Sequence, residues 1–128
     1  MKFLVDAHLL IWASTRSGRV PQRALSLLNE ENNELFFSSA SVWEITVKTA
    51  AGRSDFQIDP RLLRRNLLDN GYRELPVLSE HALALLTLPA IHKDPFDRIL
   101  IGQAIAEGIT LLTADATIAK YPGPIQKV

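Results

Sequence analysis

Short apolar runs that alternate with segments of helical spacing are the feature of this sequence that most restricts its fold. The strand candidates are residues 2–5, 35–38, 109–113 and 125–128, with a weaker one at 75–78 that contains Pro76. Strands that alternate with helices are typical of an α/β fold whose sheet is mainly parallel. The sequence therefore predicts a central, mainly parallel sheet of about four to five strands flanked by helices.

The expected helices begin at capping residues or prolines and end at glycines. They start at Ala7, near Pro21, at Ser41, at Asp59-Pro60, at Ser79 and at Asp94-Pro95, and the last turn of helix starts at Asp115. Ser41 and Glu44 have the spacing of a capping box, and that helix is expected to end at Gly52. The helix from Ser79 is expected to reach about Leu88, and the one from Asp94 to end at Gly108.

Length and composition exclude several classes of protein. The 128 residues predict one domain over residues 1–128, and the absence of cysteine excludes a disulfide scaffold, a zinc ribbon and a cysteine nucleophile. Fourteen basic and fourteen acidic side chains give a net charge of zero, so any affinity for nucleic acid has to come from a local patch. No apolar run approaches the length of a membrane span, and we expect a cytoplasmic protein with no membrane partner.

Four acidic residues fall where expected strands meet expected helices. Asp6, Glu44 and Asp115 each follow a strand, and Asp97 lies in the first turn of the long helix. The carboxyl ends of parallel strands share one edge of a sheet, where ligands bind. We therefore expect the first three acids to converge, and Asp97 to join them if its helix begins at that edge.

Converging carboxylates repel one another and need a cationic partner. A site made of carboxylate oxygens, without cysteine or paired histidines, suits Mg²⁺ or Mn²⁺. Such ions commonly serve the hydrolysis of phosphodiesters, because they activate a bound water.

Capping is the alternative explanation for these acids. Ser41 with Glu44 fits a capping box, Asp115 fits an N-cap, and Glu44 has Lys48 one turn later as an ion-pair partner. Capping explains Asp6 less well, because this residue ends an apolar strand near the N-terminus.

The residues around the four acids form motifs that resemble a known family. They are Phe3-Leu4-Val5-Asp6-Ala7-His8, Ser38-Ser39-Ala40-Ser41-Val42-Trp43-Glu44-Ile45, His92-Lys93-Asp94-Pro95-Phe96-Asp97-Arg98 and Leu111-Leu112-Thr113-Ala114-Asp115. In this order the chain resembles the PIN-domain ribonucleases, and more closely the VapC-type toxins of toxin–antitoxin pairs.

That resemblance implies a metal-dependent endoribonuclease that cuts RNA. It places the metal ligands at Asp6, Asp97, Glu44 and Asp115, with Thr113 beside them in the catalytic site. Arg98, Lys48 and Ser39 are then expected to contact the substrate, although a surface ion pair explains Arg98 equally well. The resemblance also implies a homodimer and a small antitoxin that inhibits the enzyme.

Two other functions are compared with these features, and the sequence disfavours the first. A phospho-accepting receiver-like domain needs paired acids after its first strand and an acceptor Asp after its third, and neither is present here. A non-catalytic PIN-like module that binds RNA or protein stays as the alternative, and a metal-dependent cleavage assay separates it from the nuclease.

Overall fold

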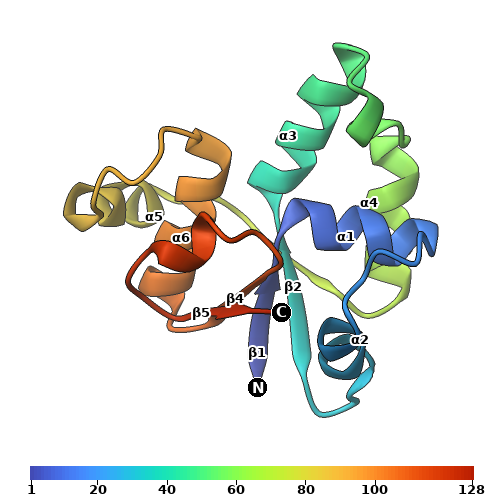
Figure 1. The fold of residues 1–128 in the computed structure, drawn as a ribbon, viewed down its shortest axis with the longest axis horizontal. Coiled ribbons are helices and arrows are strands. Elements are labelled where there is room, and N and C mark those ends of the chain that lie inside the picture. Colours follow the sequence, from blue (N-terminus) through green and yellow to red (C-terminus); the bar gives the residue numbers. More distant parts are fainter.

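A computed structural model describes the backbone of residues 1–128 and every side chain except that of Asp55. Five strands form one parallel sheet in the order β3–β2–β1–β4–β5 (Figure 1). They are β1 (Lys2–Val5), β2 (Glu34–Ser38), β3 (Arg73–Leu75), β4 (Thr110–Thr113) and β5 (Ile125–Lys127). The α-helices are α1 (Ala7–Thr15), α2 (Gln22–Asn29), α3 (Ser39–Ala50), α4 (Pro60–Asp69), α5 (Ser79–Leu83) and α6 (Pro95–Glu107). The expected α/β fold with a parallel sheet is confirmed.

The two central strands are buried on both faces of the sheet. On β1, Phe3 and Val5 pack into one apolar cluster with residues of α1 and α4, whereas Leu4 packs into a second cluster with residues of α6. On β4, Leu112 joins the first cluster and Leu111 the second. Successive side chains of a strand point to opposite faces, and a parallel sheet has both faces covered by helices. This is why these strands are continuous apolar runs.

The order of the strands reverses between β1 and β4. From β1 the chain continues to β2 and β3 on one side, and β4 and β5 pair on the other. In open parallel sheets, ligands bind outside the carboxyl ends of the strands at such a reversal. Asp6 follows β1 and Asp115 follows β4, so the topology itself puts these two acids beside the reversal.

Several helix boundaries agree with the sequence signals. Asp59 caps α4 by accepting a hydrogen bond from the backbone N–H of Arg61 at 2.9 Å. Asp94 caps α6 in the same way. Gly108, with φ of 67°, ends α6 in the left-handed conformation that favours glycine. No helix of the described chain is long and apolar enough to cross a membrane.

The start of α3 differs from the expected capping box. The helix begins at Ser39, because Ser38 at the end of β2 caps it through the backbone N–H of Ala40 at 3.0 Å. The expected start at Ser41 is therefore wrong, and Glu44 lies in the second turn of the helix instead of the first. Strand β2 leads into the helix without a loop, which the spacing of Ser41 and Glu44 does not reveal.

Three other elements differ from the sequence prediction. Strand β3 ends at Leu75, because Pro76 has no N–H for the strand ladder, so the expected strand 75–78 is wrong except at its first residue. The helix expected from Ser79 to Leu88 divides into α5 and the 3₁₀ helix η2 (Ala84–Thr87). The turn expected at Asp115 is the 3₁₀ helix η3 (Ile118–Lys120), which begins three residues later. The third 3₁₀ helix, η1 (Ser54–Phe56), has no counterpart in the prediction.

Candidate functional site

Asp6, Thr113 and Asp115 form one hydrogen-bonded group at the reversal of the sheet. Asp6 Oδ1 accepts the backbone N–H of Leu9 at 2.9 Å, and Asp6 Oδ2 accepts the hydroxyl of Thr113. The same hydroxyl oxygen accepts the backbone N–H of Asp115 at 3.0 Å. Thr113 is fully buried at the end of β4 and joins the acids that follow two neighbouring strands.

Asp6 also caps α1, which corrects the expectation that capping explains this residue poorly. Its bond to Leu9 is that of an N-cap side chain with the third helical residue. Asp115 has a similar local role, because its Oδ1 accepts the backbone N–H groups of Thr117 at 2.7 Å and Ile118 at 3.1 Å. Each acid therefore holds its own turn, and each carboxylate retains further lone pairs for a ligand.

Glu44 is buried in the second turn of α3 and pairs with Lys48. The two side chains are 4% and 20% exposed, and Lys48 Nζ lies 2.5 Å from Glu44 Oε2. The expected alternative of an ion pair one turn apart is confirmed. The ammonium also lies 4.8 Å from the ring centroid of Phe56 and 5.7 Å from that of Phe96. Lys48 thus neutralises Glu44 from an aromatic pocket.

Asp97 lies in the first turn of α6, and its carboxylate faces away from the helix cap. Asp94 Oδ1 accepts the backbone N–H groups of Phe96 at 2.9 Å and Asp97 at 3.3 Å, so Asp94 makes the N-cap bonds of α6. Asp97 makes no reciprocal bond among the described residues, and its Oδ2 lies 3.0 Å from His92 Nε2.

Burial, with a smaller contribution from neighbouring acids, raises the pKa of two carboxylates of the site. Burial raises the pKa of Asp97 to about 6, a hydrogen bond from His92 opposes this rise, and the charges of Asp94 and Glu44 add to it. Burial also raises the pKa of Asp6, with hydrogen bonds from the backbone and from Thr113 opposing and the charge of Asp115 adding. Both carboxylates therefore lack sufficient positive charge in the protein alone.

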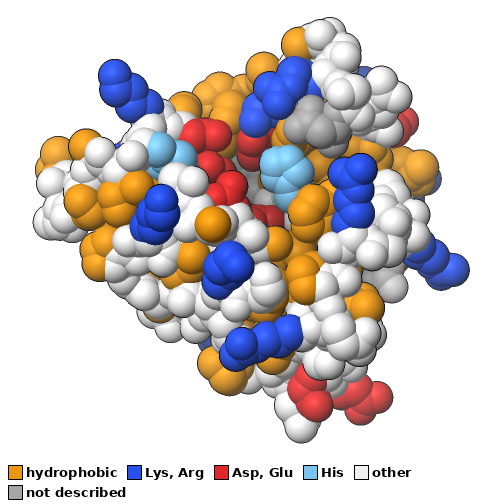
Figure 2. Space-filling model, viewed as in Figure 1, with side chains coloured by type: hydrophobic (Ala, Val, Ile, Leu, Met, Phe, Trp, Pro, Cys, Tyr) orange, Lys and Arg blue, Asp and Glu red, His pale blue; other side chains and the backbone are white. Residues whose placement is uncertain are grey.

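The pKa of His92 is also shifted by its surroundings. Burial lowers its pKa, but its hydrogen bonds to Asp97 and Tyr121 outweigh burial, so the pKa lies above its usual value. Figure 2 shows acidic side chains gathered in a hollow on the face where α1, α3 and α6 begin, with histidines at its rim. The fold thus places acidic groups from several elements around one depression.

The three residues expected to contact substrate lie in different settings. Lys48 is held by Glu44, as described. Ser39 Oγ accepts the backbone N–H of Val77 at 3.1 Å, which leaves its O–H proton free to donate. Arg98 Nη1 donates to the carbonyl of Pro89 at 2.9 Å and to Tyr121 Oη at 3.0 Å. Arg98 forms no ion pair within the described part of the chain, so the expected surface pair is wrong.

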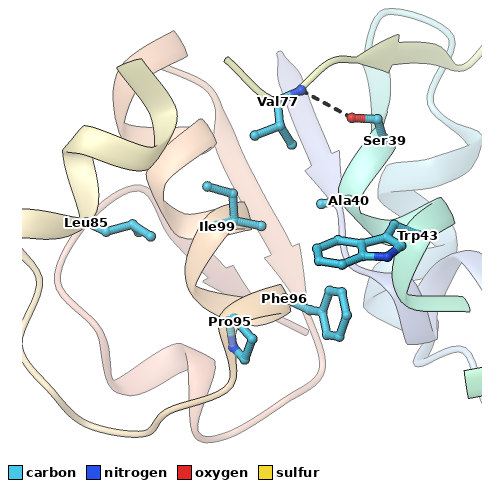
Figure 3. A pocket seen from close by; sticks show the side chains of 8 residues that line it. All are labelled: Ser39, Ala40, Trp43, Val77, Leu85, Pro95, Phe96 and Ile99. Atoms are coloured by element: carbon cyan, nitrogen blue, oxygen red, sulfur yellow. Dashed lines mark hydrogen bonds between the residues drawn. The ribbon is translucent and has the colours of Figure 1, made fainter. Parts of the chain in front are cut away.

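An apolar groove of about 470 Å³ lies between α3 and α6 (Figure 3). Trp43 and Phe96 line it, and their rings meet edge to face with centroids 4.9 Å apart. Trp43 is 62% exposed. Each of these aromatic residues directly precedes a site acid in the sequence, Glu44 or Asp97. The groove is therefore lined by the same two helices that carry Glu44 and Asp97.

Sequence reasoning missed Ser41 as a residue of this site. Its hydroxyl is buried and has no hydrogen-bond partner among the described residues. Ser41 lies three residues before Glu44 on α3, so the two side chains share a helix face. A buried hydroxyl without a partner is costly and points to a bound water or ligand. The only sequence signal was a serine near an acid, which a capping box explained as well.

A second group of potential ligands lies at the other end of α6 and does not suit a metal ion. Glu80, His81 and Glu107 bring ligand atoms within 4.8 Å of one another, and they are the only such group in the described chain. His81 Nδ1 accepts the backbone N–H of Leu78 at 2.8 Å, so Nε2 carries the proton and donates it to Glu107 at 2.8 Å. Neither ring nitrogen has a free lone pair. The four site acids stand farther apart, with Asp6 and Glu44 each held by its own partner.

Comparisons with known proteins agree with this architecture. The family model described as the PIN domain matches residues 3–124. The fold is similar to that of VapBC2 from Rickettsia felis bound to a DNA fragment from its promoter, with a TM-score of 0.73 and 15% identity over 99% of this chain and 98% of that one.

Two further solved structures are similar. DNA-bound VapBC from Salmonella typhimurium gives a TM-score of 0.71 at 17% identity, and VapBC-1 from nontypeable Haemophilus influenzae gives 0.63 at 16%. Each comparison covers 99% of this chain and 98% of the other. At these identities the likeness concerns the fold. No curated protein matches the sequence significantly.

Proposed function

Because the chain belongs to the PIN-domain family, we propose that it is a metal-dependent endoribonuclease and the toxin of a toxin–antitoxin pair. The observation that carries the proposal is that acids following β1 and β4 or lying on α3 and α6 are near enough for their charges to add to the raised pKa values of Asp6 and Asp97. Asp6 and Glu44 are 4% and 3% exposed, and the charge of Glu44 contributes to the raised pKa of Asp97. Burying carboxylates within range of one another's charge is unfavourable, and a divalent cation among them would offset this cost.

We assign the metal site to Asp6, Glu44, Asp97 and Asp115, with Mg²⁺ or Mn²⁺ as the ion. These acids supply only oxygen ligands, which hard divalent cations prefer. The unpartnered hydroxyl of Ser41 supports a hydrated ion, because it can bond a water beside Glu44. When bound, the ion activates a water for attack on phosphorus and stabilises the charge that develops on the phosphodiester.

The residues around the acids orient them and bind the substrate. Thr113 holds the Asp6 carboxylate through its hydroxyl and the Asp115 backbone through its oxygen. With Glu44 as a metal ligand, the Lys48 ammonium that now pairs with it would be available to a phosphate oxygen. Ser39 offers its O–H proton to the substrate at the rim of the groove. Arg98 is tied to Pro89 and Tyr121, so only the remaining N–H groups of its guanidinium can reach a phosphate.

RNA cleavage in defined metal conditions tests the proposal. We expect the purified protein to cut structured RNA with Mg²⁺ or Mn²⁺ and to stop when EDTA is added. Asp97→Asn should lose most of the activity, whereas Asp69→Asn on the exposed surface of α4 should retain it. If the wild type cut RNA as fast in EDTA as with metal, or if Asp97→Asn cut as fast as the wild type, the cleavage would come from a contaminating or metal-independent nuclease. Binding of RNA without cleavage in any metal would favour the non-catalytic PIN-like module.

We also propose an antitoxin partner that binds over the acidic hollow. The similar solved structures are VapBC assemblies, and the acidic hollow complements a basic side chain of a partner. A cognate antitoxin should inhibit cleavage, and mixing it with the protein should protect the RNA. Tight binding with unchanged cleavage would refute this mode of inhibition. RNA as the substrate agrees with the cytoplasmic location expected from the sequence.

We also propose a homodimer, formed through exposed apolar residues near the groove and not through α1. The apolar residues Leu9, Leu10 and Ile11 of α1 belong to the core, and Trp12 packs against them, so α1 has little apolar surface left for a partner. Of the exposed apolar residues, Trp43 and Val77 line the groove, and Leu86 on η2 follows Leu85, which also lines it. An exposed apolar surface of this kind commonly marks an interface. Light scattering should give about twice the 14.2 kDa of one chain, and Leu86→Ser should shift it toward the monomer.

A further inference from the structure

His92 lies in the loop before α6, and both nitrogens of its ring have partners. Nδ1 lies 2.7 Å from Tyr121 Oη, and Nε2 lies 3.0 Å from Asp97 Oδ2. Tyr121 is a buried residue that follows η3, and its own ring packs 5.3 Å from that of His92. Because the imidazole ring is rigid, fixing Nδ1 also fixes the direction of Nε2.

The hydrogen bonds around Tyr121 have a defined direction. Its hydroxyl oxygen accepts the backbone N–H of His92 at 3.0 Å and Arg98 Nη1 at 3.0 Å, which uses both lone pairs. Its single O–H then donates, and His92 Nδ1 at 2.7 Å is a closer acceptor than the His92 carbonyl at 3.2 Å. When Nδ1 accepts, the proton of the neutral ring is on Nε2, and the charged ring carries a proton there too, so Nε2 donates to Asp97 in either charge state. Arg98, Tyr121 and His92 together therefore direct one N–H at the Asp97 carboxylate.

Asp97 differs from the other site acids in how it is held. Asp6 and Asp115 accept backbone N–H groups of their own turns, and Glu44 pairs with a lysine of its own helix. The Asp97 carboxylate has no hydrogen-bond partner in the described chain other than His92. The orientation of Asp97 thus depends on His92. His92 in turn is held by Tyr121, which lies 29 residues further along the chain.

We propose that His92 is a positioning residue for Asp97, held in place by Tyr121 and Arg98. The inference rests on the proposed function, because it takes Asp97 as a metal ligand. His92 bonds Oδ2, so Oδ1 has no hydrogen-bond partner among the described residues and would be the oxygen available to the ion. This assigns Arg98 a role in holding the site together, in addition to any contact with phosphate. Partners that orient metal ligands are typically worth roughly 10–100-fold in metal affinity.

Calorimetric titration with Mn²⁺ tests the proposal. We expect His92→Ala to weaken Mn²⁺ binding roughly 10–100-fold. His92→Gln should recover much of the affinity, because its amide N–H can reach the position of Nε2. Tyr121→Phe, which keeps the ring but removes the hydroxyl, should have a smaller effect in the same direction. Lys93→Ala, an exposed neighbour in the same loop, is the control and should bind Mn²⁺ like the wild type.

A double-mutant cycle separates positioning from general stability. In the Asp97→Asn background, His92→Ala should change Mn²⁺ affinity less than about twofold, because the carboxylate that it orients is gone. An equal loss in both backgrounds, or no loss from His92→Ala in the wild type, would overturn the proposal while leaving the metal site intact. A wild type that binds no Mn²⁺ would overturn the metal site of the proposed function, and this inference with it.

Discussion

The Asp97 carboxyl is costly for the metal-free fold at neutral pH. Its pKa is about 6 in the folded protein and 3.8 in an ordinary peptide, so the folded state binds more protons between these values. Stability from this group is therefore present at low pH and is lost as the pH rises from about 4 to about 6. The cost above pH 6 has burial as its main cause, with the charges of Asp94 and Glu44 adding to it.

Asp97→Asn should therefore stabilise the metal-free protein. At pH 7.5 in EDTA we expect a gain of about 1–3 kcal/mol in the free energy of unfolding, and this gain should disappear near pH 4. Denaturant titrations at both pH values measure it, with Asp69→Asn as the control. A less stable Asp97→Asn at pH 7.5 would mean that the carboxylate contributes more as a structural bond to His92 than it costs by crowding.

Asp6→Asn does not separate metal binding from capping cleanly, because Asp6 also caps α1 and accepts a hydrogen bond from Thr113. The asparagine oxygen can still cap α1 at Leu9, but the amide N–H₂ would meet the hydroxyl that Thr113 now donates to Asp6. Loss of crowding and loss of this bond have opposite effects on stability. Asp97, which caps nothing, is therefore the better position for separating metal binding from capping.

Thr113→Val should disturb the two acids that Thr113 joins. The valine has nearly the same shape but neither donates to Asp6 nor accepts from the Asp115 backbone, so the buried Asp6 carboxylate and the part-buried Asp115 N–H each lose a partner. We expect a loss of about 1–3 kcal/mol in stability and a clear loss of RNA cleavage. Thr113→Ser keeps the hydroxyl and should retain most of the cleavage. Denaturant titration and the cleavage assay measure both effects, and wild-type cleavage by Thr113→Val would remove Thr113 from the site.

At the level of elements, the packing of α5 on α6 depends on one glycine. A Cβ added at Gly102 in α6 would lie 2.4 Å from the carbonyl oxygen of His81 in α5 and 3.1 Å from Leu85 Cδ2. The carbonyl belongs to the backbone and cannot turn aside. The two helices therefore approach too closely for any side chain at this position.

Gly102→Ala should separate these elements and destabilise the protein by about 1–3 kcal/mol, although alanine is the better helix former. Ala106→Gly on the exposed face of the same helix is the control, with an expected loss of about 1 kcal/mol from helix propensity alone. Thermal unfolding monitored by circular dichroism compares them. An unchanged or higher melting temperature for Gly102→Ala would show that α5 can move at no cost.

At the level of the whole molecule, binding of the proposed ion should stabilise the folded protein. It would bridge acids that follow β1 and β4 and acids carried by α3 and α6. A ligand that binds only the folded state at a hundred times its Kd stabilises it by about 2.7 kcal/mol. Mn²⁺ should therefore raise the melting temperature of the wild type, EDTA should reverse the rise, and Asp97→Asn should respond less. An equal response from Asp97→Asn would place the ion elsewhere.

The sequence by itself determined the elements and the edge of the sheet at which the site lies. Apolar runs predicted β1 and β4, capping residues and Gly108 bounded α4 and α6, and the acids followed the strands as expected. These signals are local, because propensity, capping and the special geometry of proline and glycine act within a few residues. The same local signals were ambiguous where a strand leads directly into a helix, and there the start of α3 was predicted wrongly.

Only the tertiary structure decided what holds each acid. Thr113 meets Asp6 across 107 residues, and Tyr121 meets His92 across 29. Such contacts depend on strand order and helix packing, which no local pattern contains, so the sequence indicated neither the dual role of Asp6 nor the role of His92. The sequence placed the carboxylates at one edge of the sheet. Their partners, and therefore their pKa values and directions, came from how distant segments pack.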